Sequence, residues 1–397
     1  MESNIRLTPV MGMDTETDAT QLATGGDAPA VFVRDAVNMD FNAQGKPALR
    51  RGLRMVSDAR LLDLLHDGLH GDTFGRDAEH YLVRLNTTDG RTQRMHYAGD
   101  MPVSMWPQAR RTLFATARGI LEYDGRQTQV FTLPTPAAPI LAAEGNGALD
   151  AGTYTVALAW LRGDIESACS EAASVQVRAG ERVRVTLPLC LDGGAERVRV
   201  FVSEPDGGQL YAFGSFDIAT TQVEIAAARH GMGAPRFRHM DAMPTGRYLC
   251  AWSGRLLTAQ ANLLRFSEPL AWHVHDARHG FIQMPQRITF LAPVDGGVFV
   301  GQADHVAFLT GSDMREVSVR RIACKRPVPD SAVLVGAPIA PREAGGRPVA
   351  VWLAENGHVI GMPDGSITET RAGRLAGIAG ARGCTVTLNS KLLTLAT

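Results

Sequence analysis

Short apolar stretches that alternate with polar residues run along most of the chain, and Asp-Gly, Asn-Gly and Gly-Gly pairs separate them. Such a pattern is typical of antiparallel strands joined by tight hairpins. Few stretches keep the helical period over a dozen residues. The best helical candidate is Ala59–Leu69, where leucines recur on one face, but His66-Asp67-Gly68 interrupts it and a pair of strands fits equally well. The pattern as a whole predicts an all-β protein.

One hairpin pattern recurs in the sequence. Each copy has an apolar strand, a tight polar turn, a second apolar strand and a further turn. The copies are Leu113–Gly125, Leu256–Glu268, Val298–Gly311 and Val351–Gly365. A hairpin of this size cannot bury its apolar faces alone, but several stacked around an axis can, as in a β-propeller. Any antiparallel protein contains hairpins of this kind, so the repeat favours a propeller-like array without requiring one.

A different β pattern interrupts this series between Pro136 and Ala228. Residues with period-two alternation recur there, for example Val183, Val185 and Leu187. About seven strands in roughly 90 residues are typical of an immunoglobulin-type sandwich. The Cys…Trp…Cys signature is absent, and the stretches GTYTVALAW and ESACSEAA resemble the second and third strands of fibronectin type III modules and their loop.

These patterns predict a domain order. An extended N-terminal segment covers residues 1–56, and the first part of a propeller-like domain covers 57–135. The fibronectin type III-like β-sandwich covers 136–228, and the remainder of the propeller-like domain covers 229–397. The expected fold class is therefore all-β, a β-propeller-like hairpin array with an inserted fibronectin type III-like β-sandwich.

Composition narrows the class of protein. Hydrophobic residues make up 45% of the 397 residues, which is enough for a sizeable core. The formal net charge is −1, which disfavours a strongly basic nucleic-acid-binding protein. The longest apolar run, Thr153–Leu161, is far shorter than the ~20 residues that span a bilayer, and the N-terminus lacks the features of a signal peptide. We expect neither a membrane segment nor a signal peptide.

The cysteines indicate a reducing compartment. Five are present, far apart and without a C-x-x-C pair: Cys169, Cys190, Cys250, Cys324 and Cys384. A disulfide framework or a zinc ribbon needs closely spaced pairs. We therefore predict reduced, mostly buried thiols and synthesis in a reducing cytoplasm.

Catalytic motifs are missing from the sequence. It contains no G-x-S-x-G, G-x-x-x-x-G-K-[ST], H-E-x-x-H or D-x-D-x-D-G pattern, and we expect neither enzymatic activity nor a cofactor. One cluster, His273, His275 and His279, deserves weighing, because the first two would share one side of a strand as metal ligands do. A solvent-facing strand end that runs into a loop is the simpler interpretation, so we predict no metal site.

Two basic clusters raise the question of phosphate binding, which needs positive charge concentrated on one face. Acidic neighbours and the balanced net charge favour solvated surface or salt bridges between subunits instead. The two clusters consist of Arg50, Arg51 and Arg54, and of Arg320, Arg321, Lys325 and Arg326.

Residues 12–56 have a distinctive layout: an early glycine, an extended region, an Arg-x-Ala-x-Asn-like segment, a glycine turn and an Arg-Gly close. The residues concerned are Gly12, Arg34, Asp35, Ala36, Asn38, Gly45, Arg51 and Gly52. A second stretch runs from Trp252-Ser-Gly-Arg255 to Phe266-Ser-Glu-Pro269. Both stretches resemble tail tubular, or nozzle, proteins of short-tailed bacteriophages and related head-completion and tail structural proteins.

The resemblance implies a structural protein of a phage virion that forms a ring, six-fold in our expectation, around the DNA path. It implies a homo-oligomer that contacts other tail or neck proteins and lets DNA pass without specific binding. Its position as nozzle, connector or tail tip stays open, because the chain is shorter than many nozzle proteins and carries an unusual insert. A ring closes through head-to-tail interfaces. We expect these to involve Val31, Phe32, Arg50, Arg51, Arg54 and Trp106.

Two other classes of function remain open. The chain could be a tail-tip or receptor-binding adhesion module whose loops recognise a host-surface glycan or protein. It could also be a propeller hydrolase with an unfamiliar active site. A ring within a tail would favour the structural role, and a lone monomer would favour the adhesion module.

Overall fold

The computed structural model describes residues 9–24, 30–42, 44–50, 52, 54–190, 194–227, 233–337, 339–371, 373–388 and 391–397. Regular structure in these residues consists of strands and three short 3₁₀ turns, so the prediction of an all-β protein is confirmed. The chain divides into two compact units. One unit is Ala59–Gln283, and the other combines the residues before Ala59 with Met284–Thr397.

Unit Ala59–Gln283 contains three four-stranded antiparallel sheets. The first sheet consists of β6 (Leu62–Asp67), β7 (Asp72–Arg76), β8 (Tyr81–Leu85) and β9 (Thr92–Tyr97). The second consists of β10 (Ser104–Gln108), β11 (Arg111–Thr116), β12 (Gly119–Tyr123) and β13 (Thr128–Val130). The third consists of β23 (Arg247–Trp252), β24 (Arg255–Gln260), β25 (Leu263–Phe266) and β27 (Phe281–Gln283), and a short ladder joins β22 (Asp241–Ala242) to β26 (Val274–His275).

The other unit contains two more sheets of the same kind. The fourth consists of β28 (Ile288–Val294), β29 (Gly297–Gln302), β30 (Val306–Thr310) and β31 (Ser318–Ile322). The fifth consists of β32 (Val333–Val335), β33 (Val349–Ala354), β34 (Gly357–Gly361) and β35 (Ile367–Glu369), and the hairpin of β36 (Gly383–Leu388) and β37 (Lys391–Ala396) follows it. We call the five four-stranded sheets of the described residues the blade sheets.

The repeat in the sequence corresponds to the middle of these sheets. The four predicted hairpins are β11–β12, β24–β25, β29–β30 and β33–β34, which are the second and third strands of four blade sheets. Large side chains join consecutive sheets: Phe74 packs with Phe114 and Tyr123, and Phe299 packs with Trp352. Stacked meander sheets of this kind make a β-propeller-like hairpin array.

The ambiguous stretch Ala59–Leu69 forms strand β6 and a turn rather than a helix. A bulge between Leu62 and Leu65 shifts the register, and Asp63 adopts a positive φ of 51°. The bulge breaks the alternation of apolar residues that a regular strand would show. This is why leucines in this stretch fall at spacings that also suit a helix.

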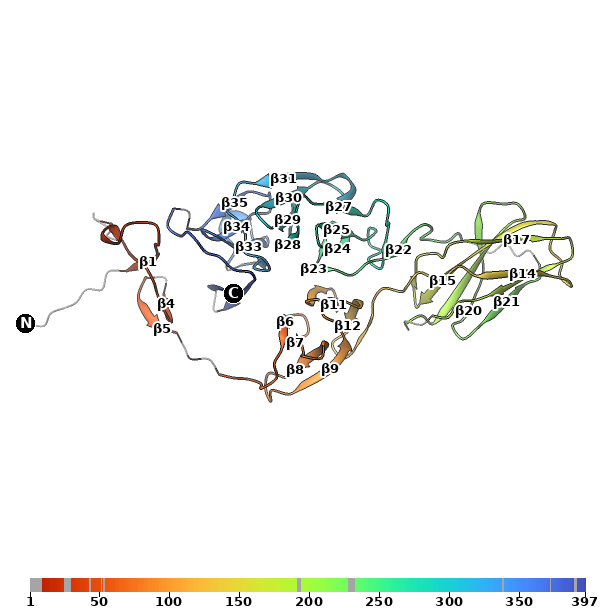
Figure 1. The fold of residues 1–397 in the computed structure, drawn as a ribbon, viewed down its shortest axis with the longest axis horizontal. Helices are drawn as coiled ribbons and strands as arrows, with labels where there is room; N and C mark the ends of the chain where they lie inside the picture. Colours follow the sequence, from red (N-terminus) through yellow and green to blue (C-terminus); the bar gives the residue numbers. More distant parts are fainter. Residues whose placement is uncertain are drawn as a thin grey trace, which may run out of the picture. The chain divides into compact units, whose positions relative to one another are not determined.

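A β-sandwich separates the second and third blade sheets in the sequence (Figure 1). One sheet contains β14 (Ile140–Glu144), β18 (Arg182–Thr186) and β21 (Gln222–Ile225). The other contains β16 (Ile165–Glu166), β15 (Gly152–Arg162), β19 (Arg197–Ser203) and β20 (Leu210–Asp217), with β17 (Ala173–Val177) also paired to β15. Both sheets contribute to one core that includes Tyr154, Val183 and Val200. The relation to fibronectin type III modules stays a prediction.

None of the described residues belongs to a helix that is long and apolar enough to cross a membrane.

Candidate assembly surface

The described residues between 9 and 50 form a small module that we call the arm. Strand β1 (Val10–Met13) pairs in parallel with β3 (Ala30–Val33), which also pairs with β2 (Ala23–Thr24). A hairpin of β4 (Met39–Phe41) and β5 (Pro47–Leu49) follows. The backbone N–H of Val10 donates a hydrogen bond of 3.0 Å to the Gly45 carbonyl and so links this hairpin to β1.

Asp14 organises the turn that follows β1. Its carboxylate accepts hydrogen bonds from the backbone N–H groups of Glu16, at 3.2 Å, and Thr17, at 2.9 Å, and from the Thr17 hydroxyl at 2.8 Å. The hydrogen bond from the Thr17 backbone is the main cause that lowers the pKa of Asp14. Arg374 adds an ion pair at 3.1 Å. The carboxylate is therefore held in its charged form, facing an arginine from the far end of the chain.

The C-terminal segment, which we define as the described residues between 371 and 391, receives the arm. The Arg374 guanidinium lies over the Phe32 ring at 3.9 Å from its centroid, and the Arg374 carbonyl accepts a 2.8 Å hydrogen bond from the Thr15 N–H. Arg371 donates to the Met11 carbonyl at 3.0 Å. Arm and C-terminal segment thus meet through backbone pairing and one cation–π contact.

A second contact lies at the tip of the C-terminal hairpin. The Lys391 ammonium donates hydrogen bonds of 2.7 Å to the Asp40 carboxylate and 3.0 Å to the Phe41 carbonyl. The bond from Lys391 is the main cause that lowers the pKa of Asp40. Both charged pairs therefore place a carboxylate of the arm against a cation of the C-terminal segment.

Exposed apolar side chains are frequent in the arm, in the C-terminal hairpin and in the connector, by which we mean the described residues between β5 and β6. Eight of the seventeen large hydrophobic residues that are exposed among the described ones belong to the arm, its connector or the C-terminal hairpin. They are Met11, Val37, Leu49, Met55 and Val56 on the N-terminal side and Val386, Leu388 and Leu395 on the hairpin. Exposed apolar side chains in these three parts of the chain are available for a protein–protein contact.

The predicted interface residues fall in different surroundings. Val31 and Phe32 lie in β3, where Phe32 is buried under Arg374. Arg50 and Arg54 are exposed, and the Arg50 N–H donates to the Asn38 carbonyl at 3.1 Å. Arg51 lies outside the described residues.

Trp106 lies in β10 and packs against the cluster that joins the second and third blade sheets, close to Trp272. It is partly exposed, and a subunit contact through that part stays a prediction. Within the chain Trp106 acts as a contact between blade sheets.

The sequence analysis did not identify the residues that receive the arm. Asp14 could have been found, because a carboxylate three residues before Thr17 fits a local turn in which the side chain caps the backbone. Arg371, Arg374 and Lys391 carry no comparable local signal. They become functional candidates only once the fold brings them beside the arm.

A second polar cluster, which we call the joint, connects the sandwich to the blade sheets of its own unit. Glu166 in β16 accepts 2.6 Å and 3.0 Å hydrogen bonds from the Arg199 side chain and the Arg236 backbone N–H. The Glu166 carbonyl accepts a 2.9 Å hydrogen bond from Nε2 of His273. Arg162 donates to the carbonyls of Val130 and Phe131, at the end of β13 in the second blade sheet.

The three histidines of the predicted cluster do not converge. His273 binds the Glu166 carbonyl and His275 binds the Phe266 carbonyl at 3.0 Å, whereas His279 contacts the Asp276 carboxylate at 3.1 Å. The interpretation as a solvent-facing strand end is wrong for His275, which is buried and whose ring bonds to the carbonyl of Phe266, the last residue of β25. The described residues include no group of three or more His, Cys, Asp or Glu side chains placed to hold a metal ion.

Asp67, His70 and Thr112 form a buried cluster with the composition of a nucleophilic triad. Asp67 lies 2.8 Å from Nδ1 of His70, and the Thr112 hydroxyl also donates to Asp67 at 2.8 Å. A triad needs its acid and its nucleophile on opposite ring nitrogens. Here the acid and the hydroxyl both face Nδ1, so the cluster ties a turn of the first blade sheet to β11 of the second.

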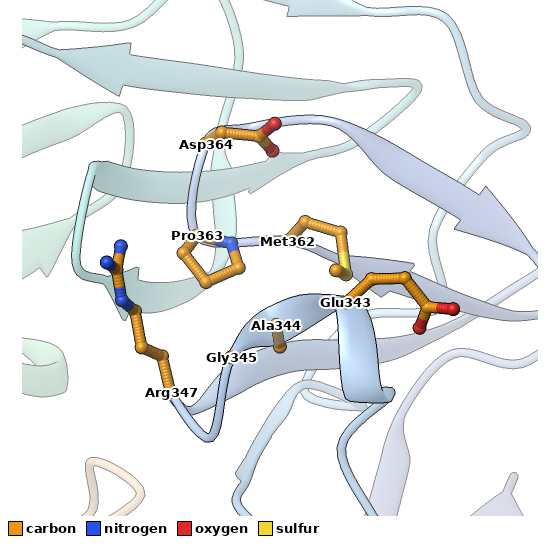
Figure 2. Close-up of a pocket in the computed structure, with 7 residues that line it drawn as sticks. All are labelled: Glu343, Ala344, Gly345, Arg347, Met362, Pro363 and Asp364. Carbon is orange, nitrogen blue, oxygen red and sulfur yellow. The ribbon is translucent and has the colours of Figure 1, made fainter.

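A shallow pocket of about 260 Å³ lies beside the fifth blade sheet. It is formed by the 3₁₀ turn Arg342–Ala344 and the turn after β34, with Ala344, Met362 and Pro363 in its lining. Figure 2 shows the charged ends of Glu343, Arg347 and Asp364 standing apart around it. This arrangement does not bring their charges to a common point.

Comparisons with known proteins concern the fold alone. No family model and no curated protein matches the chain. BamB from Moraxella catarrhalis is similar at 13% identity and a TM-score of 0.33, with 83% of this chain and 82% of that chain covered. BBS1N in complex with ARL6DN is similar at 13% identity and a TM-score of 0.33, with 86% of this chain and 90% of that chain covered. The β-propeller domain of Cps50 (Swd1) from Myceliophteria thermophila is similar at 11% identity and a TM-score of 0.31, with 80% of this chain and 86% of that chain covered. The description as a propeller-like array rests on the strand pairing of the blade sheets.

Proposed function

We propose that this chain is a structural component of a tailed bacteriophage virion and forms a ring in the tail or neck around the DNA path. The observation that carries the proposal is where the residues of the phage resemblance lie. Several of them occupy positions of the arm at which the backbone tolerates few other residues. The resemblance therefore follows a physically constrained module rather than a shared composition.

Gly12, Asn38 and Gly45 are these positions. Gly12 has a φ of +143°, and a Cβ there would lie 2.7 Å from the Arg371 guanidinium. Gly45 has a φ of +73°, and a Cβ there would lie 2.7 Å from the Val10 nitrogen. Asn38 adopts a φ of 52°, a conformation that asparagine tolerates better than most residues. Both glycines are favoured by their conformation, and Gly45 is also required by close approach, because the nearest atoms belong to the Val10 backbone, whereas the Arg371 side chain beside Gly12 can move.

The second stretch of the resemblance is constrained in the same way. Ser253 and Gly254 both have positive φ values, 48° and 71°, which is the conformation of a tight two-residue hairpin turn. Arg255 is buried and donates to the Ser267 carbonyl at 2.7 Å, and the Ser267 hydroxyl accepts from the Leu256 N–H at 2.9 Å. These residues hold strands β24 and β25 and the following loop in place.

A ring role further implies contacts with copies of the same chain and with neighbouring tail or neck proteins. The exposed apolar residues of the arm and the C-terminal hairpin provide a surface for such contacts. In this role DNA passes through the channel without specific binding, which suits a net charge of −1. The mature location is the virion, after synthesis in the host cytoplasm.

Purified particles test the proposal. We expect mass spectrometry of density-purified virions to find this chain in multiple copies, and labelled antibodies to mark the tail or neck in electron micrographs. Absence from purified virions would contradict the structural role. A monomer that binds host cells and is found at the distal tip would favour the adhesion module instead.

A further inference from the structure

The contact between the arm and the C-terminal segment has two chemically different sides. The arm contributes the carboxylates of Asp14 and Asp40, and the C-terminal segment contributes the cations of Arg374 and Lys391, at 3.1 Å and 2.7 Å. Arg374 and Lys391 are about two-fifths exposed, so they are reachable from solvent. Asp40 is half exposed, so its pair with Lys391 is weak, whereas Asp14 is only 1% exposed and its pair with Arg374 is shielded from solvent. Neither pair belongs to the apolar core of a blade sheet, so the contact can separate without unfolding these sheets.

The connector does not fix which copy of the C-terminal segment the arm docks on, its own or that of another copy. No strand occurs in the described residues between β5 and β6, and Met55 and Val56 are exposed there. Docking within one chain also leaves Val37 and Leu49 of the arm at 78% exposure each. Apolar residues in such positions gain stability when a second surface covers them.

We propose that the arm is exchanged between copies, so that the arm of one copy docks on the C-terminal segment of its neighbour. The occupant of the C-terminal segment is then a second copy of this chain, because charges of the arm already match it at Asp14–Arg374 and Asp40–Lys391. Exchange of identical elements keeps every contact and requires movement of the connector alone.

Arm exchange also fits the geometry that a ring needs. The arm and the C-terminal segment are different surfaces of one chain. Each copy therefore donates its arm to one neighbour and receives the arm of the other neighbour on its C-terminal segment. This is a heterologous, head-to-tail interface, which closes into a ring when the rotation per copy allows. Closure of the exchanged copies into a ring rests on the proposed function, whereas the exchange of arms itself does not.

A mixing experiment with two variants tests the exchange. The first variant lacks residues 1–50 and keeps the C-terminal segment intact. The second carries Arg374→Glu and Lys391→Glu, which disable the C-terminal segment, and keeps the arm. We expect the full chain to be oligomeric in light scattering coupled to size exclusion, and each variant alone to be monomeric. An equal mixture should form a one-to-one complex, because the arm of the second variant fits the intact C-terminal segment of the first.

Three further variants keep the test decisive. Arg382→Glu is the matched control, because Arg382 lies in the same segment but pairs with Asp330, and it should assemble like the full chain. If the deletion variant does not fold, the charge-reversed pair Asp40→Lys and Lys391→Asp replaces it. Each should weaken assembly alone, and their mixture should restore it.

The outcomes separate this inference from the proposed function. An arm-deleted chain that assembles like the full chain, or a mixture that stays monomeric while the full chain is oligomeric, would overturn the exchange. A monomeric full chain would overturn it as well. An exchanged oligomer that is missing from purified virions would uphold the exchange and contradict the structural role in the phage.

Discussion

Tyr154 is fully enclosed by the core of the sandwich, with 1% of its surface exposed. Its hydroxyl donates a 3.2 Å hydrogen bond to the Asp150 carbonyl. Tyr154→Ala should lower the free energy of unfolding of the sandwich by about 3–5 kcal/mol, because it removes a large buried side chain and leaves a cavity. Hydrogen exchange of the β15 amides of the full chain in increasing urea measures this loss.

Tyr154→Phe is the matched control for this substitution. It keeps the ring and removes the hydroxyl alone, so the expected loss is about 0.5–1.5 kcal/mol. A loss below about 0.5 kcal/mol for Tyr154→Ala would mean that the ring does not belong to the core.

Single residues were predictable where their chemistry stands out from the local sequence. Phe32 stands out as an aromatic residue in a polar stretch and was predicted at a subunit interface; in the structure it is buried under Arg374 of its own chain, and the interface role stays a prediction. Glu166 has no such signal, because a glutamate beside a serine reads as solvated surface. Its role at the joint depends on Arg199 and His273, which are remote in the sequence.

At the scale of elements, the joint should respond to pH through His273. Burial lowers the pKa of His273, and Arg236 and Arg162 lower it further, whereas the hydrogen bond to the Glu166 carbonyl opposes them. When the contacts of the joint separate, His273 regains its ordinary, higher pKa. The separated form therefore binds a proton at His273 more readily than the intact joint. The stability of the joint should be complete above the ordinary histidine pKa of about 6.5 and should fall as the pH drops towards the lowered value.

Hydrogen exchange near the joint measures this effect. The Cys169 N–H, which donates to the Phe237 carbonyl at 3.0 Å, should lose protection below about pH 6.5 in the full chain. His273→Gln keeps an N–H donor and cannot titrate, so the pH dependence should disappear. His279→Gln is the control, because His279 is mostly exposed and faces Asp276, and it should leave the dependence unchanged. Persistent pH dependence in His273→Gln would contradict this role.

The first blade sheet depends on a buried ion pair. Arg76 of β7 donates to Asp63 of β6 at 2.8 Å and to the Gly99 carbonyl at 3.0 Å, and both side chains of the pair are nearly inaccessible. Asp63→Ala should destabilise this sheet by about 3–5 kcal/mol, because it leaves a buried charge without its partner.

The double variant Asp63→Ala, Arg76→Met checks that explanation. It removes both charges, so it should recover much of the loss in thermal unfolding of the full chain. Arg91→Ala, at an exposed pair with Asp89, should change stability by less than about 0.5 kcal/mol. A double variant as unstable as Asp63→Ala would show that packing or the positive φ at position 63, not the charge, determines the effect.

Charged residues within a strand, such as Arg76 of this ion pair, decide which hairpins could be predicted from the sequence. Hairpins such as β29–β30 were visible because nearly every residue is buried and apolar. The hairpin β7–β8 was missed because Arg76 and Arg84 interrupt its apolar pattern, although Arg76 is buried in the sheet. In the sandwich, the continuous apolar run of β15 is accounted for by burial on both faces, with Tyr154 on one and Ala157 on the other.

At the scale of the whole molecule, sequence patterns indicated the order of β segments but not the long-range pairing. Asp14 and Arg374 are 360 residues apart, and neither residue carries a sign of the other. Burial and alternation are local properties, whereas a contact between the two ends depends on the complete fold. The C-terminal segment was therefore inaccessible to sequence reasoning as the partner of the arm, and the arm was predicted as an extended segment without its paired strands.

Removal of residues 1–30 tests the arm at this scale. It deletes Met11, Asp14 and Thr15, so Arg371 and Arg374 lose their hydrogen bonds and the ion pair to the arm, although Phe32 under Arg374 remains, and the blade sheets keep their own cores. We expect a folded chain by circular dichroism, with faster hydrogen exchange in residues 371–376 and unchanged exchange in Ala59–Gln283. If the arm docks on neighbouring copies as proposed, the truncated chain should not enter particles when it is supplied in place of the full chain. Infectious particles built from the truncated chain would contradict the assembly role, and for a truncated chain that fails to fold the charge-reversed pair Asp40→Lys and Lys391→Asp provides the test instead.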